Sequence, residues 1–385
     1  MMARGIVLAA GGTGGHVFPA EALAAELRAA GHELALVTDV RGIAYGGALA
    51  GIDVHRIPAG TPGVGGPLRR ARGVLLAVAG TLRAVRLLRR LKPVAVVGFG
   101  GYPSLPTMLA ALWLRIPTLV HEQNAVLGRV NRLLVPWVTR VGLSFSATGR
   151  LDDAAQPKAE VVGNPVRPEV LAIRAGGYAP PSADGPIRLL VLGGSQGAAV
   201  FSEVVPSALA LLPAELRARL KLAQQCRPET LAAARAICDA AGIDAELAPF
   251  FGDVPARLAV AHLVICRAGA STVAELKAAG RPAVLVPYPH AVDDHQTANA
   301  RSVAGAGGGW IVPQSEFTPA RLAELLRRLF AHPDDLDRAA EQCRGEDRPE
   351  AARALAALVE NLVAPRVRVV PAAAMGAARG RRVSE

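Results

Sequence analysis

Two glycine-rich turns, each at the end of a short apolar segment, set the strongest limit on how this chain can fold. Residues 6–10 (Ile-Val-Leu-Ala-Ala) run into residues 11–16 (Gly-Gly-Thr-Gly-Gly-His), and residues 189–192 run into residues 193–197 (Gly-Gly-Ser-Gln-Gly). A glycine turn between a strand and a helix directs backbone N–H groups at an anion, and the helix N-terminus adds partial positive charge. The sequence therefore predicts two α/β domains that face one ligand cleft.

Short apolar segments alternate with helix-forming stretches along both halves of the chain. The segments that we expect to form strands are residues 5–8, 34–37, 94–97, 118–120, 141–144 and 161–162 in the first half, and 189–192, 220–224, 263–266 and 283–286 in the second. Pro19 is expected in the first turn of the first helix, which carries Leu23 and Leu27 on one face and ends at Gly31. This alternation forms right-handed βαβ units, so the expected fold class is α/β with parallel sheets.

Length and composition suggest where the expected parts begin and end. The chain has 385 residues, of which 51% are apolar, and it is too long for one ordinary core. A stretch rich in Gly, Pro, Ser and Asp lies between Ala175 and Pro186. The expected parts are a first domain at 1–167, a linker at 168–186, a second domain at 187–365 that ends in helices at 319–330 and 349–363, and a basic disordered tail at 366–385.

Simple counts disfavour several classes of protein. Four cysteines without a C-x-x-C pair favour a reduced setting over a disulfide scaffold or a zinc site. The longest uncharged run, between Lys92 and Arg115, is interrupted by glycines and prolines, which argues against a transmembrane helix. The net charge of +11 favours anionic partners, whether nucleic acid, anionic lipid or phosphorylated substrates.

The first glycine turn is a poor match to a dinucleotide-binding fingerprint. That fingerprint requires G-x-G-x-x-G, and here Val17 stands where the third glycine belongs, although Asp39 imitates the ribose-binding acid. A cradle for a phosphate or a sugar fits at least as well. His16 closes the turn and has two interpretations: a loop histidine that caps the following helix, or a general base that titrates near neutral pH.

Polar residues follow other expected strands at the same edge of the sheet. Residues 98–104 (Gly-Phe-Gly-Gly-Tyr-Pro-Ser) form a third glycine turn, and residues 121–124 (His-Glu-Gln-Asn) come directly after the strand at 118–120. Ligands of open α/β sheets bind at the carboxyl edge of the strands. The four polar residues therefore predict a functional role, with a polar network that only fixes the loop as the alternative.

A further set of polar residues lies in the second half. Residues 267–272 (Arg-Ala-Gly-Ala-Ser-Thr) lead into a helix and supply N-cap and anion-binding groups. The two oxygens of Glu275 suit neighbouring ribose hydroxyls, and an acid that stabilises the helix dipole is equally consistent. Gln296 and Asn299 share a helix face and suit sugar hydroxyls. The rival interpretation of that region is a metal site at His290, Asp293, Asp294 and His295.

One segment, residues 68–92, is both basic and apolar and contains no acid. An amphipathic helix packed on a core explains its leucines. The missing acids favour contact with anionic lipid head groups. Both interpretations remain open on the residues alone.

Together these segments resemble the MurG family, the lipid-linked N-acetylglucosaminyltransferases of bacterial peptidoglycan synthesis, in glycosyltransferase family 28. The matching stretches are residues 11–16, 98–104, 121–124, 163–167 (Gly-Asn-Pro-Val-Arg), 193–197 and 269–275, followed by 294–296 (Asp-His-Gln) and Asn299. They keep the order of the family over roughly residues 5–365. Each stretch is weakly informative alone, but all of them in order are highly specific.

The resemblance implies the GT-B fold, two Rossmann-like domains whose parallel sheets face a cleft, with the C-terminal helix crossing back to the first domain. It implies inverting transfer of N-acetylglucosamine from UDP-N-acetylglucosamine to the C4 hydroxyl of undecaprenyl-pyrophosphoryl-N-acetylmuramoyl-pentapeptide. No metal or other cofactor is implied, because helix dipoles and Arg167 would offset the charge of the departing diphosphate.

The resemblance also assigns roles to single residues. His16 is the expected catalytic base, with Glu122 as the alternative. Ser195 and the turn at Ser271 would hold phosphate oxygens, and Glu275 would hold the ribose. The expected substrate-binding residues are Thr13, Gly14, Gly15, Asn124, Arg167, Ser195, Phe251 (through its backbone, to uracil), Ala270, Ser271, Thr272, Val273, Ala274, Glu275 and Gln296 (to the donor sugar).

The partners expected from the resemblance are UDP-N-acetylglucosamine, the lipid-linked acceptor, an anionic membrane surface and cell-wall synthesis proteins, with no nucleic acid. The expected location is peripheral, at the cytoplasmic face of the bacterial cell membrane, with residues 68–92 and the region through Trp113 against the lipid. The nearest alternative is another GT-B enzyme that uses a UDP-sugar, such as a lipid glucosyltransferase or a sugar 2-epimerase. A non-catalytic basic binding module and a nicotinamide oxidoreductase are rivals from other classes.

Overall fold

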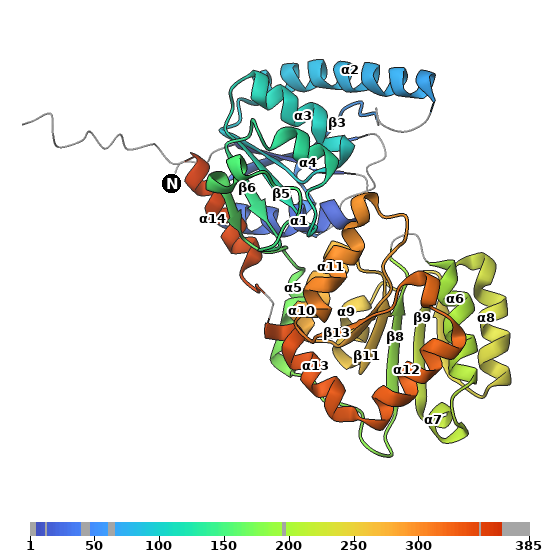
Figure 1. The fold of residues 1–385 in the computed structure, drawn as a ribbon. Coiled ribbons are helices and arrows are strands. Elements are labelled where there is room, and N and C mark those ends of the chain that lie inside the picture. The colour runs from blue at the N-terminus through green and yellow to red at the C-terminus, as the bar shows by residue number, and fades with distance from the viewer. Residues whose placement is uncertain are drawn as a thin grey trace, which may run out of the picture.

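The computed structural model describes residues 5–11, 14–39, 47–60, 66–194, 198–345 and 348–363. Thr13, Ser195 and the basic tail expected at 366–385 lie outside these residues. The strands form two sheets in which every pairing is parallel, and each sheet is covered by helices on both faces (Figure 1). We call residues 5–163 with 348–363 the first unit and residues 164–345 the second unit.

The first sheet has the strand order β3-β2-β1-β4-β5-β6-β7. Its strands are β1 (Gly5–Ala9), β2 (Glu33–Thr38), β3 (Asp53–Arg56), β4 (Ala95–Gly98), β5 (Thr118–Glu122), β6 (Arg140–Leu143) and β7 (Ala159–Val161). The central strands are buried along their length, which is why they read as unbroken apolar runs rather than alternating ones. The order reverses between β1 and β4, so a ligand crevice is expected beyond their carboxyl ends.

The second sheet repeats this arrangement with the order β10-β9-β8-β11-β12-β13. Its strands are β8 (Ile187–Leu192), β9 (Leu220–Gln225), β10 (Asp244–Ala248), β11 (Leu263–Cys266), β12 (Ala283–Leu285) and β13 (Gly309–Ile311). Here the order reverses between β8 and β11, again beside a glycine-rich turn.

The helices alternate with the strands along the chain. The α-helices are α1 (Gly14–Ala29), α2 (Pro67–Leu91), α3 (Gly101–Trp113), α4 (Arg129–Leu134), α5 (Pro168–Ile173), α6 (Ala199–Ala210), α7 (Ala214–Arg219), α8 (Pro228–Ala240), α9 (Val254–Val260), α10 (Ala270–Ala279), α11 (His295–Ala304), α12 (Pro319–Ala331), α13 (Pro333–Gly345) and α14 (Ala351–Val363). The short 3₁₀ helices are η1 (Gly47–Leu49), η2 (Asp153–Lys158), η3 (Arg174–Gly176), η4 (Val292–Asp294) and η5 (Gln314–Glu316).

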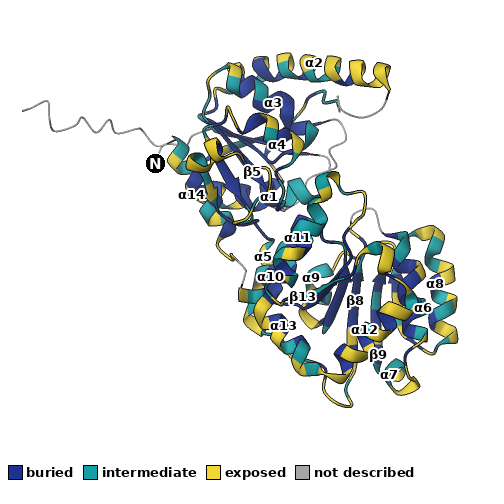
Figure 2. Cartoon of the chain, viewed as in Figure 1, coloured by how far each residue is buried: buried dark blue, intermediate teal, exposed yellow. Residues whose placement is uncertain are grey.

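Two apolar layers bury each sheet, which Figure 2 shows as the dark interior between exposed helix faces. On the first sheet, α2, α3 and α4 cover one face, and α1 and α14 cover the other. The C-terminal helix thus crosses back to the first unit, where Leu355 and Val359 pack in one cluster with Leu23 and Leu27. On the second sheet, α6, α8 and α12 lie on one face and α5, α9, α10 and α13 on the other.

The expected linker contains helices, and the last helix of the chain packs on the first sheet. The range expected as a linker contains α5 and η3, and Val170 of α5 is fully buried against the core of the second unit. The last helix belongs by its packing to the first sheet, although the sequence places it after the second. Each unit is therefore built from segments that are distant in sequence.

The expected strands all lie in the structure within a few residues of their predicted ends, and three strands were missed. These are β3, β10 and β13, and each forms an edge of its sheet. Edge strands carry polar or glycine residues because one side is not covered, so they lack the apolar run that marked the others. The placement of Pro19 was also wrong, because α1 already begins at Gly14 and Pro19 lies inside it.

Candidate active site

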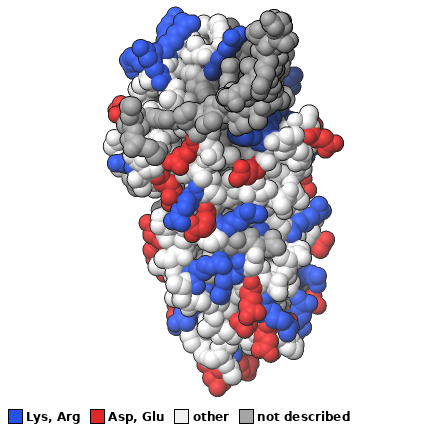
Figure 3. Space-filling model, turned by 90° about the vertical axis from the view of Figure 1, so that its left-hand side faces the viewer, with Lys and Arg blue, Asp and Glu red and all other residues white. Residues whose placement is uncertain are grey.

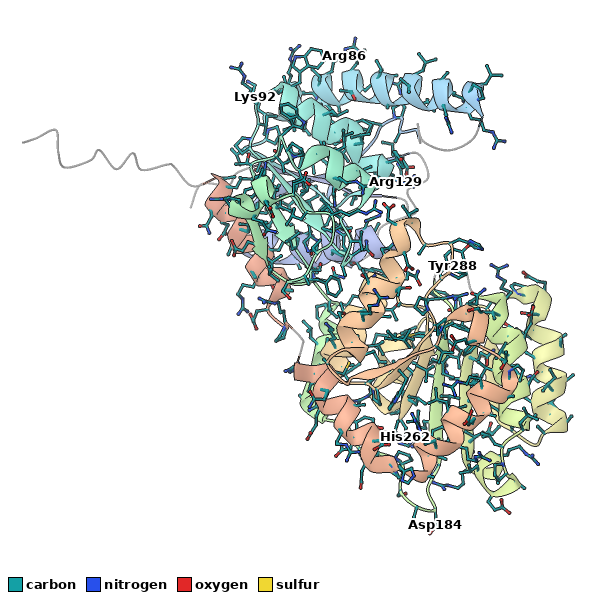
Figure 4. All side chains as sticks on the ribbon, viewed as in Figure 1. Arg86, Lys92, Arg129, Asp184, His262 and Tyr288 are labelled. Atoms are coloured by element: carbon teal, nitrogen blue, oxygen red, sulfur yellow. The ribbon has the colours of Figure 1, made fainter. Side chains whose placement is uncertain are left out.

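The carboxyl ends of strands from both sheets face one cavity of about 660 Å³. Tyr288, labelled in Figure 4, lies on the side of the second unit that is turned toward the first. The lining residues of the first unit are Gly14, Gly15, His16, Phe18, Gln123 and Asn124. Those of the second unit include Gly193, Gly194, Arg227, Arg267, Gly269, Ala270, Ser271, Thr272, Tyr288, His295, Gln296 and Gln314. We call this space the large cavity.

Several helix N-termini open onto the large cavity, among them those of α1 and α10. Gly14 and Gly15 begin α1. The N-cap of α10 is Gly269, which has no side chain to accept a hydrogen bond from the first N–H groups of that helix. The first N–H groups of a helix have no partner within the helix and carry the positive end of its dipole. Ser271 Oγ is buried and has no hydrogen-bond partner among the described residues. This wall is suited to an anion such as a diphosphate.

His16 lies in the first turn of α1, with its side chain held from the neighbouring sheet edge. Its Nδ1 is 3.0 Å from Gln123 Oε1. A Cβ atom placed on Gly101 would lie 3.2 Å from His16 Nε2, so that nitrogen faces the glycine turn after β4. The helix-capping interpretation of His16 is wrong, because the residue is inside the helix and bonds to another loop.

Glu122 holds a loop together rather than offering a free carboxylate. Its Oε1 accepts from Asn124 N at 3.0 Å and from Asn124 Nδ2 at 3.1 Å. Its Oε2 accepts from Gly128 N at 2.8 Å and from Asn131 Nδ2 at 2.9 Å. The side chain is buried, and each of its oxygens accepts two hydrogen bonds from the protein instead of from water.

A smaller cavity of about 250 Å³ lies against the first unit. It is lined by Glu122, by the turn at Gly100, Gly101 and Tyr102, by residues 126–131 and by Val292, Asp293 and His295. Arg129, on its wall, lies in the part of the first unit nearest the second (Figure 4). Three residues line both cavities: His16, Asn124 and His295. His16 therefore stands where two spaces of different size meet.

The helix α11 carries the two amides that were expected to read sugar hydroxyls together, and only one of them does line the large cavity. Gln296 lines it and accepts a hydrogen bond from Tyr288 N at 2.9 Å. Asn299 is instead fully buried between the units. The expectation of a shared sugar contact is therefore wrong for Asn299.

Arg167 and Glu275 pair with each other behind the cavity wall. Arg167 Nε and Nη2 both donate to Glu275 Oε1, at 3.0 and 2.7 Å. The guanidinium lies 5.0 Å from the ring centroid of Phe18, which lines the large cavity. Burial raises the pKa of the Glu275 carboxyl, and the adjacent Arg167 acts in the opposite direction. Glu275 is in the second turn of its helix, so it is not a first-turn acid.

Other expected residues lie elsewhere. Val273 and Ala274 line a separate cavity of about 440 Å³ between the units, one turn along α10. Phe251 is buried under the guanidinium of Arg257, 4.0 Å from its ring centroid, and does not line the large cavity. Their roles as substrate-binding residues remain predictions, as do those of Thr13 and Ser195.

Sequence reasoning included Arg267 in the stretch 267–272 but gave it no role of its own, and it lines a cationic and aromatic part of the large cavity. Arg267 lies over the rings of Phe201 and Tyr288, 5.1 and 5.4 Å from their centroids, and its Nη2 donates to Gln314 Oε1 at 2.5 Å. The signal was its place directly after the buried strand β11, the position at which the polar residues after β5 were noticed.

No group of three or more His, Cys, Asp or Glu side chains is placed to hold a metal ion within the described ranges. The residues of the rival metal site have other partners. Asp293 accepts from Arg132 at 3.2 Å and lies 2.9 Å from Arg150, both in the first unit. His295 Nδ1 lies 2.8 Å from Val292 O. The metal interpretation of this region has no support in the geometry.

Comparison with protein families agrees with these two halves. The model of the glycosyltransferase family 28 N-terminal domain matches residues 6–143, and that of the family 28 C-terminal domain matches residues 188–355. The chain belongs to glycosyltransferase family 28. Its two sheets and cleft have the GT-B fold of that family.

Individual relatives in the family carry one name, UDP-N-acetylglucosamine--N-acetylmuramyl-(pentapeptide) pyrophosphoryl-undecaprenol N-acetylglucosamine transferase. The protein of that name from Rhodospirillum rubrum is 57% identical over 366 residues, which cover 95% of this chain and 94% of the relative. The one from Sphingopyxis alaskensis is 50% identical over 386 residues and covers 98% of each chain.

Solved structures give the same result. The crystal structure of Acinetobacter baumannii MurG matches with a TM-score of 0.74 and 32% identity, covering 93% of this chain and 99% of that one. A UDP-GlcNAc 2-epimerase from Neisseria meningitidis, bound to UDP-GlcNAc, matches with a TM-score of 0.62 and 11% identity, covering 93% and 100%. At that identity the second likeness shows the fold alone.

Proposed function

We propose that the chain transfers N-acetylglucosamine from UDP-N-acetylglucosamine to the C4 hydroxyl of undecaprenyl-pyrophosphoryl-N-acetylmuramoyl-pentapeptide, with inversion at the anomeric carbon. The observation that carries the proposal is the position of His16, where the large cavity meets the smaller one. Transfer to a hydroxyl is helped by a base that takes its proton, and that base must lie where the donor and the acceptor meet. Membership of family 28 and the shared name of the relatives support this reaction over others of the same fold.

The donor fits the large cavity. Its diphosphate would lie against the N-termini of α1 and α10, with Ser271 and Thr272 as hydroxyl donors. The sugar would contact Gln296. Both hydrogen bonds from Arg167 fall on Oε1 of Glu275, so Oε2 is the oxygen that would accept from a ribose hydroxyl. The guanidinium of Arg167, which lies over the ring of Phe18 at the cavity wall, would be the positive charge nearest to the leaving diphosphate on this side.

The reaction is a single in-line displacement. The C4 oxygen of the acceptor attacks C1 of N-acetylglucosamine while His16 Nε2 takes the hydroxyl proton. The new bond between O4 and C1 forms as the bond from C1 to the diphosphate oxygen breaks, and that electron pair leaves on UDP. Of the two candidate bases we favour His16, because both oxygens of Glu122 are occupied by loop donors.

The acceptor would approach from the membrane side, over α2 and the end of α3. Leu68, Leu75 and Trp113 are exposed there at 87%, 69% and 63%. An apolar groove of about 340 Å³ runs between α2 and α3. Residues 68–92 contain no Asp or Glu, Lys and Arg are visible at the upper end of the face drawn in Figure 3, and Arg86 and Lys92 mark the same edge in Figure 4. This face would bind the anionic cytoplasmic surface of the cell membrane.

The helices of the described residues include none whose length and apolar content would let it cross a bilayer. Attachment through α2 is therefore proposed as peripheral. Cell-wall synthesis proteins are proposed as further partners, and nucleic acid is not.

Transfer of labelled sugar tests the proposal. The protein is incubated with UDP-N-acetylglucosamine that is labelled in the sugar and with the lipid acceptor in anionic vesicles. We expect label in the butanol-extractable lipid, and much less with His16→Ala. Label recovered only as free sugar would favour an epimerase, and no lipid-linked label at all would overturn the transferase.

A further inference from the structure

We infer that Gln123 and His121 are positioning residues that fix the tautomer of His16 through a continuous chain of hydrogen bonds. The chain begins at the carbonyl oxygen of Gly163, passes through the side chains of His121 and Gln123, and ends at His16 Nδ1. The inference rests on the proposed function for one point only, namely that His16 is the base. The position of the proton on the His16 ring does not depend on the proposed reaction.

The contact at Gly163 decides which atoms donate and which accept along this chain of hydrogen bonds. His121 Nε2 lies 2.9 Å from Gly163 O, and a carbonyl oxygen can only accept, so Nε2 carries the proton. His121 is fully buried, with the edge of its ring against Phe99, and burial lowers its pKa to about 4. At neutral pH the ring therefore holds one proton. Its Nδ1 is left with a lone pair.

That lone pair sets the orientation of the Gln123 amide. Gln123 Nε2 lies 3.1 Å from His121 Nδ1 and donates to His121 O at 2.9 Å. Both N–H groups of the amide thus meet acceptors. A flipped amide would place its oxygen against two acceptors, and that arrangement is unfavourable in a buried site. The oxygen of Gln123 therefore faces His16.

The last step places the proton on His16. An amide oxygen only accepts, so His16 Nδ1, 3.0 Å from Gln123 Oε1, must donate. Nε2 is then the nitrogen with the lone pair. It faces Gly101, which lines the smaller cavity and whose missing Cβ leaves space beside it. The hydrogen-bond chain thus presents an unprotonated nitrogen to the smaller cavity, which is the space left for the acceptor when the donor fills the large one.

The chain works against the intrinsic preference of imidazole. A histidine free in water favours the tautomer with its proton on Nε2, which would offer no lone pair to the acceptor. A buried partner that accepts from Nδ1 reverses the preference, and a carboxylate commonly fills this role. Here the partner is a neutral amide whose orientation is set by a second, neutral histidine. The group that orients the base through Nδ1 is therefore uncharged.

The test reads the proton directly. In protein labelled with ¹⁵N at the histidine rings, the His16 resonances are assigned by their loss in His16→Gln. At neutral pH we expect the hydrogen of His16 on Nδ1 and that of His121 on Nε2. Finding the His16 proton on Nε2 would overturn the inference, whatever the enzyme does with its substrates.

A pair of matched variants tests the consequence. Gln123→Leu breaks the chain of hydrogen bonds to His16. Gln224→Leu removes another fully buried amide, in the core of the second unit. With Gln123→Leu we expect the His16 proton to move to Nε2 and kcat to fall about 10- to 100-fold, as for other residues that orient a histidine from behind. Gln123 lines the large cavity, but its amide groups are already bonded to His16 and His121, so the KM for UDP-N-acetylglucosamine should stay within about twofold. Gln224→Leu should change neither.

The outcomes distinguish failure of the proposed function from failure of the positioning role of Gln123. If the tautomers are as expected but wild-type protein forms no lipid-linked product, the proposed function fails and the chain of hydrogen bonds stands. If transfer occurs and Gln123→Leu shifts the His16 proton with no change in kcat, His16 is not the base and the positioning role is refuted. If Gln123→Leu leaves the His16 tautomer unchanged, the amide does not set it.

Discussion

The side-chain oxygen of Asn299 accepts a hydrogen bond from the backbone N–H of Ala125 at 2.8 Å, across the boundary between the two units. The amide nitrogen of Asn299 donates to Asn124 Oδ1 and to Ala268 O, each at 3.1 Å. Asn124 lines both cavities. One buried side chain of α11 therefore holds the loop of the first unit that carries part of the candidate site.

Asn299→Ala should weaken both the fold and the reaction. The change leaves buried polar groups of Ala125 and Ala268 without partners, and each such group costs roughly 1–3 kcal/mol. We expect a lower midpoint of thermal unfolding and a lower kcat, because Asn124 is no longer held. Ser302→Ala, on the same helix, is the control. A variant with normal stability and lost activity would instead indicate that Asn299 contacts substrate.

Glu122→Gln separates a loop-holding carboxylate from a catalytic one. All four donors around Glu122 are N–H groups, so the NH₂ of a glutamine would face a donor and destabilise the loop. We expect a lower unfolding midpoint and reduced kcat, with an unchanged pH profile for the activity that remains. His16→Ala should instead lower kcat about 10²- to 10⁴-fold and leave UDP binding intact. Loss of the acid limb of the profile in Glu122→Gln would make Glu122 the base.

The parts of the fold that sequence reasoning found are those with a strong local signal. Buried central strands such as β1 and β11 are continuous apolar runs, and glycine turns mark their ends. The strands β3, β10 and β13 have no such run, because they lie at sheet edges. That α14 covers the first sheet could not be read from its own residues, since an apolar helix face does not specify which sheet it packs on.

The candidate site was predicted in the same uneven way. The residues after β1, β5 and β11 were found because polar or glycine residues directly follow buried strands. The pairing of Arg167 with Glu275 was not found, since the partners are 108 residues apart and each alone suits a ligand. Asn299 was assigned to a sugar because its helix face was known, whereas the opposing loop of the other unit was not.

Glu275→Gln should weaken UDP binding, because the carboxylate is the proposed acceptor for a ribose hydroxyl. It should not weaken the fold. Burial raises the pKa of Glu275 above its ordinary value of 4.5, so the folded state holds this proton more tightly than the unfolded state does. The contribution of Glu275 to the free energy of unfolding is thus greatest below pH 4.5 and is lost as pH rises through the folded pKa. Relative to wild type, the variant should gain stability as the pH rises toward neutral.

Calorimetric titration with UDP and thermal unfolding at several pH values measure both effects. Glu215→Gln, at an exposed glutamate of α7, is a control for the change in charge. Unchanged UDP affinity in Glu275→Gln would remove the ribose assignment. A variant that loses stability steadily toward neutral pH would show that the ion pair with Arg167 outweighs the burial of the carboxylate.

His121 should make the fold sensitive to acid. Burial lowers its pKa from 6.5 to about 4, so the unfolded chain takes up this proton first as the pH falls. Its contribution to stability is present above pH 6.5 and is lost on acidification through pH 4, on the order of 3 kcal/mol in total. His121→Gln should flatten the fall in unfolding free energy over that range, measured by urea denaturation. His332→Gln, at an exposed histidine, is the control, and equal slopes in all three proteins would refute the prediction.

Leu75→Glu should release the protein from anionic membranes. Leu75 of α2 is 69% exposed, and burying a leucine side chain contributes roughly 1.5–3 kcal/mol, so binding to vesicles should weaken about 10- to 100-fold. Leu211, 61% exposed in the second unit, gives the matched control Leu211→Glu with the same change in charge. Co-sedimentation with vesicles that contain anionic lipid measures the binding.

The same pair of variants tests whether this face also delivers the acceptor. With the acceptor in vesicles, Leu75→Glu should raise its apparent KM, because the enzyme spends less time at the surface that holds the substrate. With a short-chain acceptor in solution, the two variants should have equal KM, since Leu75 is exposed on α2 and lines neither of the cavities that His16 lines. Equal loss in both variants would mean that added negative charge, rather than the α2 face, weakens membrane binding.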